Sequence, residues 1–86
     1  MAVKKKHSHD FVESYDGLVG YGLNRETDEN TLAYYLQKFS DDRHVKAILK
    51  RMSDEDMDKL FNDICGLLKK YLKEEEYHEL FLKDEH

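Results

Sequence analysis

The sequence predicts an all-α fold, a small bundle of four or five short helices around a central helix near residues 53–72. Three observations predict this class. Apolar residues recur at steps of three and four in successive segments, which places them on one face of an α-helix. The chain contains no proline, so nothing of that kind interrupts a helix. Its 86 residues are enough for one domain with one modest core.

The segment at 53–72 carries the clearest helix signals. Ser53, with Asp56 three residues later, has the pattern of a capping box, and Met52 before the cap can pack on Met57 in the first turn. The apolar residues that follow gather into a stripe roughly 140° wide at about 100° per residue. They are Met57, Leu60, Phe61, Ile64, Leu67, Leu68, Tyr71 and Leu72. A stripe this wide predicts a central helix that is buried on several sides.

The N-terminal region predicts a tail and then a short helix. Residues 1–8 are basic and offer no apolar face, which predicts a disordered tail, and a single helical-bundle domain then covers 9–86. Asp10 is expected to cap a helix over about 11–21. Two glycines in that helix would each cost about 1 kcal/mol relative to alanine. They indicate close backbone packing, a frayed end, or a hinge or binding loop.

Two further helices are predicted before the central one. The first covers about 28–39, with Thr27 or Asp28 as its cap. The second covers about 42–52 and starts with acidic residues, which suit the positive end of a helix dipole. Both repeat the same four-position apolar ridge, which is typical of bundle helices. The ridges are Leu32, Tyr35, Leu36 and Phe39, and Val45, Ile48, Leu49 and Met52.

Beyond the central helix the apolar face changes sides. If the helix continued, Glu75 would fall within the apolar stripe, and the next apolar group would lie nearly opposite at about 100° per residue. That group is Tyr77, Leu80 and Phe81. Either the chain bends near 73–76 and forms a fifth short helix over about 75–82, or one long helix projects toward another molecule. The bend is favoured because a small core gains from these aromatic residues, although no glycine or proline marks it.

No pattern in the sequence indicates catalysis. Cys65 is the single cysteine and lies beside the apolar stripe, where a small core residue is expected. The acidic residues cluster at helix starts and on polar faces, whereas general acid–base chemistry needs carboxylates in a cleft. We therefore expect no enzyme, no catalytic residue and no cofactor. The lone cysteine and the absence of an apolar run of about 20 residues predict a cytoplasmic protein without a membrane span.

A metal-binding helical protein is the first alternative. Glu75 with His78, and Asp41 with His44, have the carboxylate-x-x-His spacing that places two ligands on adjacent turns of a helix. The other segments show no acidic residue within an apolar ridge, so we assign no metal site.

A nucleic-acid-associated regulator is the second alternative. Lys46, Lys50 and Arg51 lie close together on one predicted helix, and the N-terminal tail is basic. The formal net charge of −5 argues against a general nucleic-acid binder, because such affinity comes from many lysines and arginines that neutralise phosphates.

The function that the sequence favours is a non-catalytic cytoplasmic module for protein–protein interaction or self-association. Outward ridges of helical bundles bind other chains, and aromatic residues usually supply the anchors. We expect the partner surface at Tyr77, Leu80 and Phe81, with help from Tyr21 and Leu23. The same residues would suit the core of a five-helix arrangement equally well.

Overall fold

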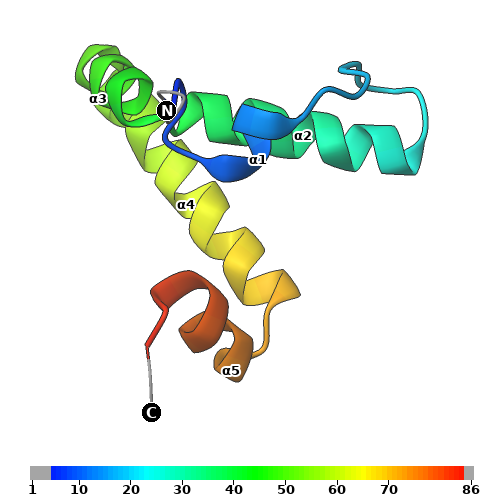
Figure 1. The fold of residues 1–86 in the computed structure, drawn as a ribbon. Coiled ribbons are helices and arrows are strands. Elements are labelled where there is room, and N and C mark those ends of the chain that lie inside the picture. Colours follow the sequence, from blue (N-terminus) through cyan, green and yellow to red (C-terminus); the bar gives the residue numbers. More distant parts are fainter. Residues whose placement is uncertain (1–4, 85–86) are drawn as a thin grey trace. The chain divides into compact units, whose positions relative to one another are not determined.

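The computed structural model describes residues 5–84 of the chain (Figure 1). It divides into two compact units, Met1–Arg51 and Met52–His86, and each is described by itself. The described residues contain five α-helices and one π-helical segment, and no strand. The predicted all-α class, with four or five short helices, is therefore confirmed. Of the tail expected over 1–8, the first four residues lie outside the described part.

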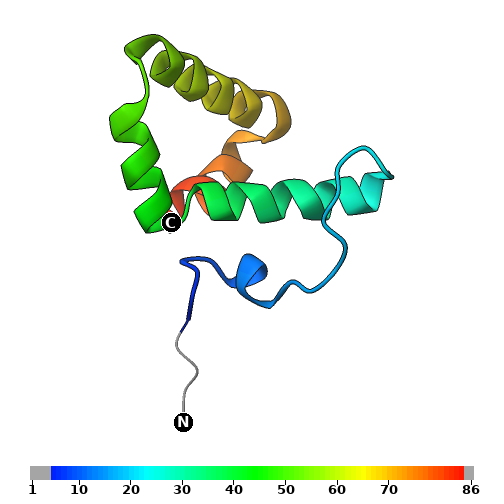
Figure 2. The same ribbon diagram turned by 90° about the horizontal axis from the view of Figure 1, so that it is seen from above.

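Unit 1 contains three helices, α1 (Asp10–Ser14), α2 (Arg25–Phe39) and α3 (Asp42–Arg51). Helix α1 lies beside α2 in both views (Figures 1 and 2). Val12 of α1 is 3% exposed and is the one buried hydrophobic residue of the described chain. Its N–H donates to the Gln37 side-chain oxygen of α2 at 2.9 Å, so an apolar contact and a hydrogen bond join these helices.

The helix expected over 11–21 is much shorter than predicted. Helix α1 ends at Ser14, and Tyr15 adopts an extended conformation. The Tyr15 hydroxyl donates to the Leu18 carbonyl at 2.7 Å, which holds the chain in a turn that a helix would not allow. The prediction failed because the two glycines lower the helix propensity, and because contacts with α2 hold residues 15–24 outside a helix. Asp10 does not cap α1, since its carboxylate binds Lys5.

The starts of α2 and α3 agree better with the sequence. Helix α2 begins three residues earlier than predicted, because the Asn24 side chain accepts the Thr27 N–H at 2.8 Å and caps the helix there. Helix α3 begins at Asp42, as predicted, and ends at Arg51, one residue before the predicted end.

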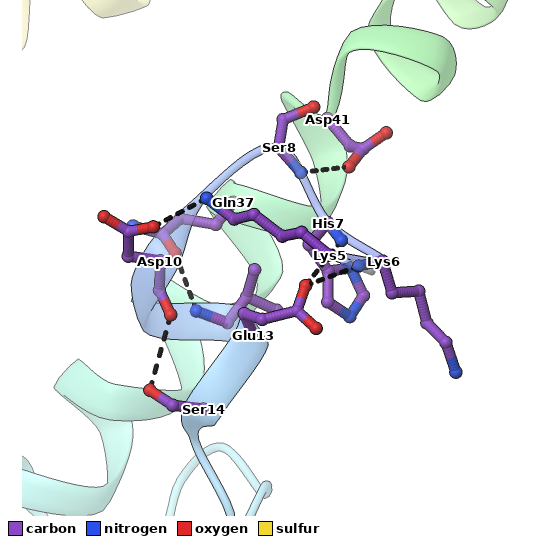
Figure 3. A network of polar contacts seen from close by, with 10 residues as sticks. Lys5, Lys6, His7, Ser8, Asp10, Glu13, Ser14, Gln37 and Asp41 are labelled. Atoms are coloured by element: carbon purple, nitrogen blue, oxygen red, sulfur yellow. Dashed lines mark hydrogen bonds and ion pairs between the residues drawn. The ribbon is translucent and has the colours of Figure 1, made fainter. Parts of the chain in front are cut away.

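A network of hydrogen bonds attaches residues 5–9 to α1 and to the start of α3 (Figure 3). The Glu13 carboxylate accepts two backbone N–H groups, from Lys6 at 2.9 Å and from His7 at 2.6 Å. The Ser8 N–H donates to Asp41 at 2.8 Å, and the Ser8 hydroxyl accepts the Asp42 N–H at 3.0 Å. The side chains of Glu13 in α1 and Asp41 directly before α3 therefore accept hydrogen bonds from successive backbone N–H groups of this segment.

Unit 2 contains α4 (Asp54–Tyr71), α5 (Glu74–Glu76) and the π-helical segment η1 (Tyr77–Leu82). The Ser53 hydroxyl accepts the Asp56 N–H at 3.1 Å, so the predicted cap is present. The helix predicted over 53–72 is confirmed to within one residue at each end.

The bend near residues 73–76 is also present, and the alternative of one long helix is wrong. Leu72 and Lys73 are both extended, with ψ values of 141° and 160°. The Lys73 N–H donates to the Glu76 side chain at 2.9 Å, which satisfies a donor at the start of the next helix. A side-chain cap thus replaces the glycine or proline that such a break usually contains.

Candidate interaction surfaces

One face of α4 is apolar and open to solvent. The sequence predicted that this face would be buried, but no residue of α4, which the structure describes throughout, is buried. That prediction failed because unit 2 contributes only α5 and η1, which are too short to cover an 18-residue helix. We call the open face the α4 stripe. It consists of Met57 (39% exposed), Phe61 (67%), Ile64 (44%), Leu67 (56%) and Tyr71 (68%).

One side of α4 faces the C-terminal helices of the same unit. Leu68 of α4, Leu72 directly after α4 and Tyr77 of η1 line an open groove of about 420 Å³. Cys65, Lys69 and Glu74 complete its wall. Leu68, Leu72 and Tyr77 are half-buried, in contrast to the residues of the α4 stripe. Segment η1 therefore shields one side of the C-terminal half of α4 and leaves the stripe open.

The predicted surface on η1 is partly exposed. Leu80 and Phe81 are 56% and 52% exposed. Tyr77 is half-buried, and its ring stacks on Phe81 with centroids 5.4 Å apart and planes 11° apart. Two of the three residues thus lie on the surface, and the third, Tyr77, lines the groove and stacks on Phe81.

The predicted loop residues Tyr21 and Leu23 belong to unit 1, so the structure does not join them to the η1 group within one unit. Their side chains are 72% and 59% exposed. The backbone around them is nevertheless well held. The Asp28 carboxylate accepts the N–H groups of Gly22 at 2.7 Å and Leu23 at 3.2 Å. Gly22 has a φ of 92°, a conformation in which other residues are strained.

Thr31 is the second anchor of this loop. It is 3% exposed and lies on α2. Its hydroxyl accepts the Gly20 N–H at 3.0 Å and donates to the Gly20 carbonyl at 3.1 Å. This side chain satisfies both backbone groups of one loop residue and thereby sets the position of Tyr21.

An apolar groove of about 270 Å³ lies beside the loop. It is lined by Gly20, Tyr21, Thr31, Leu32 and Tyr35. The ridge of α2 that the sequence placed in a core is also open, since Leu32, Tyr35 and Leu36 are about half exposed or more. Each unit therefore carries an exposed apolar surface formed by one helix and a neighbouring segment.

Three of the four residues in the pairs that suggested a metal site, His78, His44 and Asp41, make other hydrogen bonds. In the part of the chain that the structure describes, no group of three or more His, Cys, Asp or Glu side chains could hold a metal ion. The His78 ring bonds to Asp84 at 2.9 Å, and the His44 ring bonds to the Phe39 carbonyl at 2.8 Å. The Ser8 N–H donates to Asp41 and holds the pKa of that carboxyl below its ordinary value of 3.8.

The basic cluster named by the sequence is exposed. Lys46, Lys50 and Arg51 lie on α3 with open side chains. At the N-terminal side of the same unit, Lys5 binds Asp10 at 2.6 Å, and this bond lowers the pKa of the Asp10 carboxyl. One lysine of the basic tail is thus engaged within the protein.

Two features of these candidate surfaces were not predicted from the sequence. The α4 stripe was interpreted as core, because its spacing is the same whether the same chain or another chain covers it. Thr31 was not singled out, since a threonine one position from an apolar ridge gives no signal until the loop that it binds is known. The heptad spacing of the α4 stripe, at positions 57, 64 and 71, was a signal that could have indicated helix pairing.

Comparison with known proteins finds no match for this chain among protein-family models, curated proteins or solved structures. Among the residues that the structure describes, no helix has both the length and the apolar character needed to cross a membrane.

Proposed function

We propose that the chain is a non-catalytic cytoplasmic module that binds a protein partner or a second copy of itself. The observation that carries this proposal is the exposure of the α4 stripe. Phe61 and Tyr71, its two aromatic residues, are each about two-thirds exposed. Contiguous apolar surface of this kind on a soluble protein marks an interaction site.

The binding surface of this proposal includes the α4 stripe and the neighbouring η1 residues. Leu80 and Phe81 extend the apolar surface of unit 2, and Tyr77 supports Phe81 by ring stacking. Tyr21 and Leu23 form a further contact region on unit 1, where Asp28 and Thr31 hold the loop. Holding a loop in place before binding lowers the entropy that association costs.

The proposal is tested with the Leu80→Asp, Phe81→Asp double variant. We expect this variant to keep its helical circular dichroism signal, because both side chains are more than half exposed in the chain. We also expect it to weaken association in sedimentation experiments. The Asn62→Asp variant adds a negative charge elsewhere on α4 and is the control.

A different result would show that these residues are core. If the native chain sediments as a monomer at every concentration and the double variant loses its helical signal, Leu80 and Phe81 stabilise the fold rather than an interface. The η1 surface would then have to be abandoned. If the native chain is monomeric and the double variant is well folded, self-association is excluded, and the partner has to be a different protein.

A further inference from the structure

We infer that the α4 stripe is covered by the α4 stripe of a second copy of this chain, with the two helices antiparallel. This inference rests on the proposed function and names its partner. Three observations support it, namely the symmetry of the stripe, the distribution of charge along α4 and the area that the stripe offers.

The apolar residues of the stripe are arranged symmetrically about Ile64. Met57 and Tyr71 lie seven residues on either side of it, and Phe61 and Leu67 lie three residues on either side. In an antiparallel pair with Ile64 on the two-fold axis, Met57 of each copy faces Tyr71 of the other, a favourable sulfur–aromatic contact. Phe61 similarly faces Leu67. Every large residue of the stripe then meets an apolar residue of the partner.

The charges at the two ends of α4 are complementary in the same arrangement. The first turn carries Asp54, Glu55 and Asp56, and the last turn carries Lys69 and Lys70. Antiparallel helices place each acidic end beside the basic end of the other copy, whereas parallel helices would place like charges together. Near the centre of the helix, Asp63 pairs with Lys59 of the same chain at 3.0 Å. This pairing reduces the repulsion between the Asp63 carboxylates of the two copies across the two-fold axis.

Asp56 and Lys70 provide the most direct pair. They precede Met57 and Tyr71 by one residue each and are two heptads apart, so both lie on the same side of the stripe. The other side carries Leu68 and faces the groove beside η1. The side with Asp56 and Lys70 is clear of that groove and flanks the stripe, and antiparallel pairing brings Asp56 of one copy next to Lys70 of the other.

The area of the stripe is sufficient for a weak dimer. Its five side chains are between 39% and 68% exposed. A fully exposed large side chain has an accessible area of roughly 200 Å², so the five side chains together expose about 500 Å² of apolar surface per copy. A symmetric pair would bury about 1,000 Å² in total, which is at the lower limit for a specific interface. We therefore expect a dimer that dissociates on dilution.

Charge reversal at Lys70 tests the pairing. Lys70→Glu turns two attractive contacts per dimer into repulsive ones, so we expect the dissociation constant to rise about tenfold in sedimentation equilibrium at low salt. Lys46→Glu makes the same charge change on α3 and is expected to leave the constant within about twofold. The Asp56→Lys, Lys70→Glu double variant restores opposite charges and should recover most of the lost affinity.

Spin labels give the orientation of the two helices independently. A label on the native Cys65, which is exposed, lies almost on the proposed axis. In a Cys65→Ser background, labels at Asp58→Cys would be displaced from each other by roughly 18 Å along the helix axis, at 1.5 Å per residue. We expect a clearly longer distance for the second pair than for the first. Equal distances at both sites would indicate parallel helices and overturn the inference.

Failure of this inference can be separated from failure of the proposed function. A dimer that responds equally to Lys70→Glu and Lys46→Glu would overturn antiparallel pairing and leave the module intact. A monomeric chain that keeps its helices after Phe61→Asp would exclude the second copy and leave another protein as partner. A monomeric chain that unfolds after Phe61→Asp would mean that the same chain covers the stripe, and both proposals would be wrong.

Discussion

Replacement of Thr31 by valine should destabilise unit 1 far more than the same replacement at Thr27 on the same helix. The two substitutions are chemically identical and preserve side-chain shape. Thr31 is 3% exposed, and its hydroxyl makes both hydrogen bonds to Gly20, whereas Thr27 is half-buried near the helix start. The difference between the two variants therefore reports the contribution of the hydroxyl and its loop contacts.

The magnitude follows from the groups left without a partner. Thr31→Val removes the acceptor of the Gly20 N–H and the donor to the Gly20 carbonyl, at a penalty of about 1–3 kcal/mol for an unsatisfied buried group. The added methyl group recovers up to about 0.8 kcal/mol. Because Gly20 is only half-buried, water can partly replace the hydroxyl. We expect a net loss of about 1–2 kcal/mol, against less than about 0.5 kcal/mol for Thr27→Val.

Urea unfolding followed by circular dichroism measures the free energy of unfolding of both variants. Amide hydrogen exchange at Gly20 provides a local readout, and we expect its protection to fall in Thr31→Val alone. The reasoning is refuted if the two variants have the same stability and Gly20 exchanges at the native rate in both.

Three further predictions concern other parts of the chain. Gly66→Ala should stabilise unit 2 by about 0.5–1 kcal/mol in urea unfolding, because a methyl group there meets nothing within 4 Å beyond the adjoining residues and the local backbone of α4, and alanine favours a helix. An unchanged or lower stability would contradict this. Acidification should loosen residues 5–9. The pKa of Asp41 in the folded chain lies below the ordinary value of 3.8, so the Asp41 carboxylate stabilises the fold above pH 3.8 and loses this effect as the pH falls through its folded-state pKa. Exchange of the Ser8 amide against pH measures this, and an Asp41→Asn variant that retains the same acid transition would disprove the assignment. Hydrogen exchange across residues 70–84 should show a gap in protection at Glu74 and Glu75, whose amides open the first turn of α5 and precede the backbone bond from the Tyr77 N–H to the Lys73 carbonyl. Continuous protection would indicate an unbroken helix.

The sequence predicted helices best where a cap and an apolar period coincide. Ser53 and the stripe that follows it located α4 to within one residue at each end. The start of α3 was equally clear from its acidic residues. Both signals are local, because a capping hydrogen bond and an i, i+3, i+4 spacing depend only on neighbours in the chain.

Predictions failed where a distant residue decides the local conformation. The segment 15–24 has enough apolar residues for a helix, but the side chains of Thr31 and Asp28 in α2 accept hydrogen bonds from its backbone and hold it in a non-helical conformation. The bend after α4 was expected without a visible cause, and the structure supplies one in the bond from Lys73 to Glu76. The partner surface at Tyr77, Leu80, Phe81, Tyr21 and Leu23 stays a prediction.

The amino-acid sequence by itself determined the all-α class, the long helix of unit 2 and the face on which its apolar residues gather, because helix period and capping are local properties. Only the tertiary structure decided which of those faces are covered. Burial depends on what other segments reach a given face, and α5 and η1 together are shorter than α4 and reach only one side of it. The stripe from Met57 to Tyr71 stays open in unit 2, and its partner is a prediction.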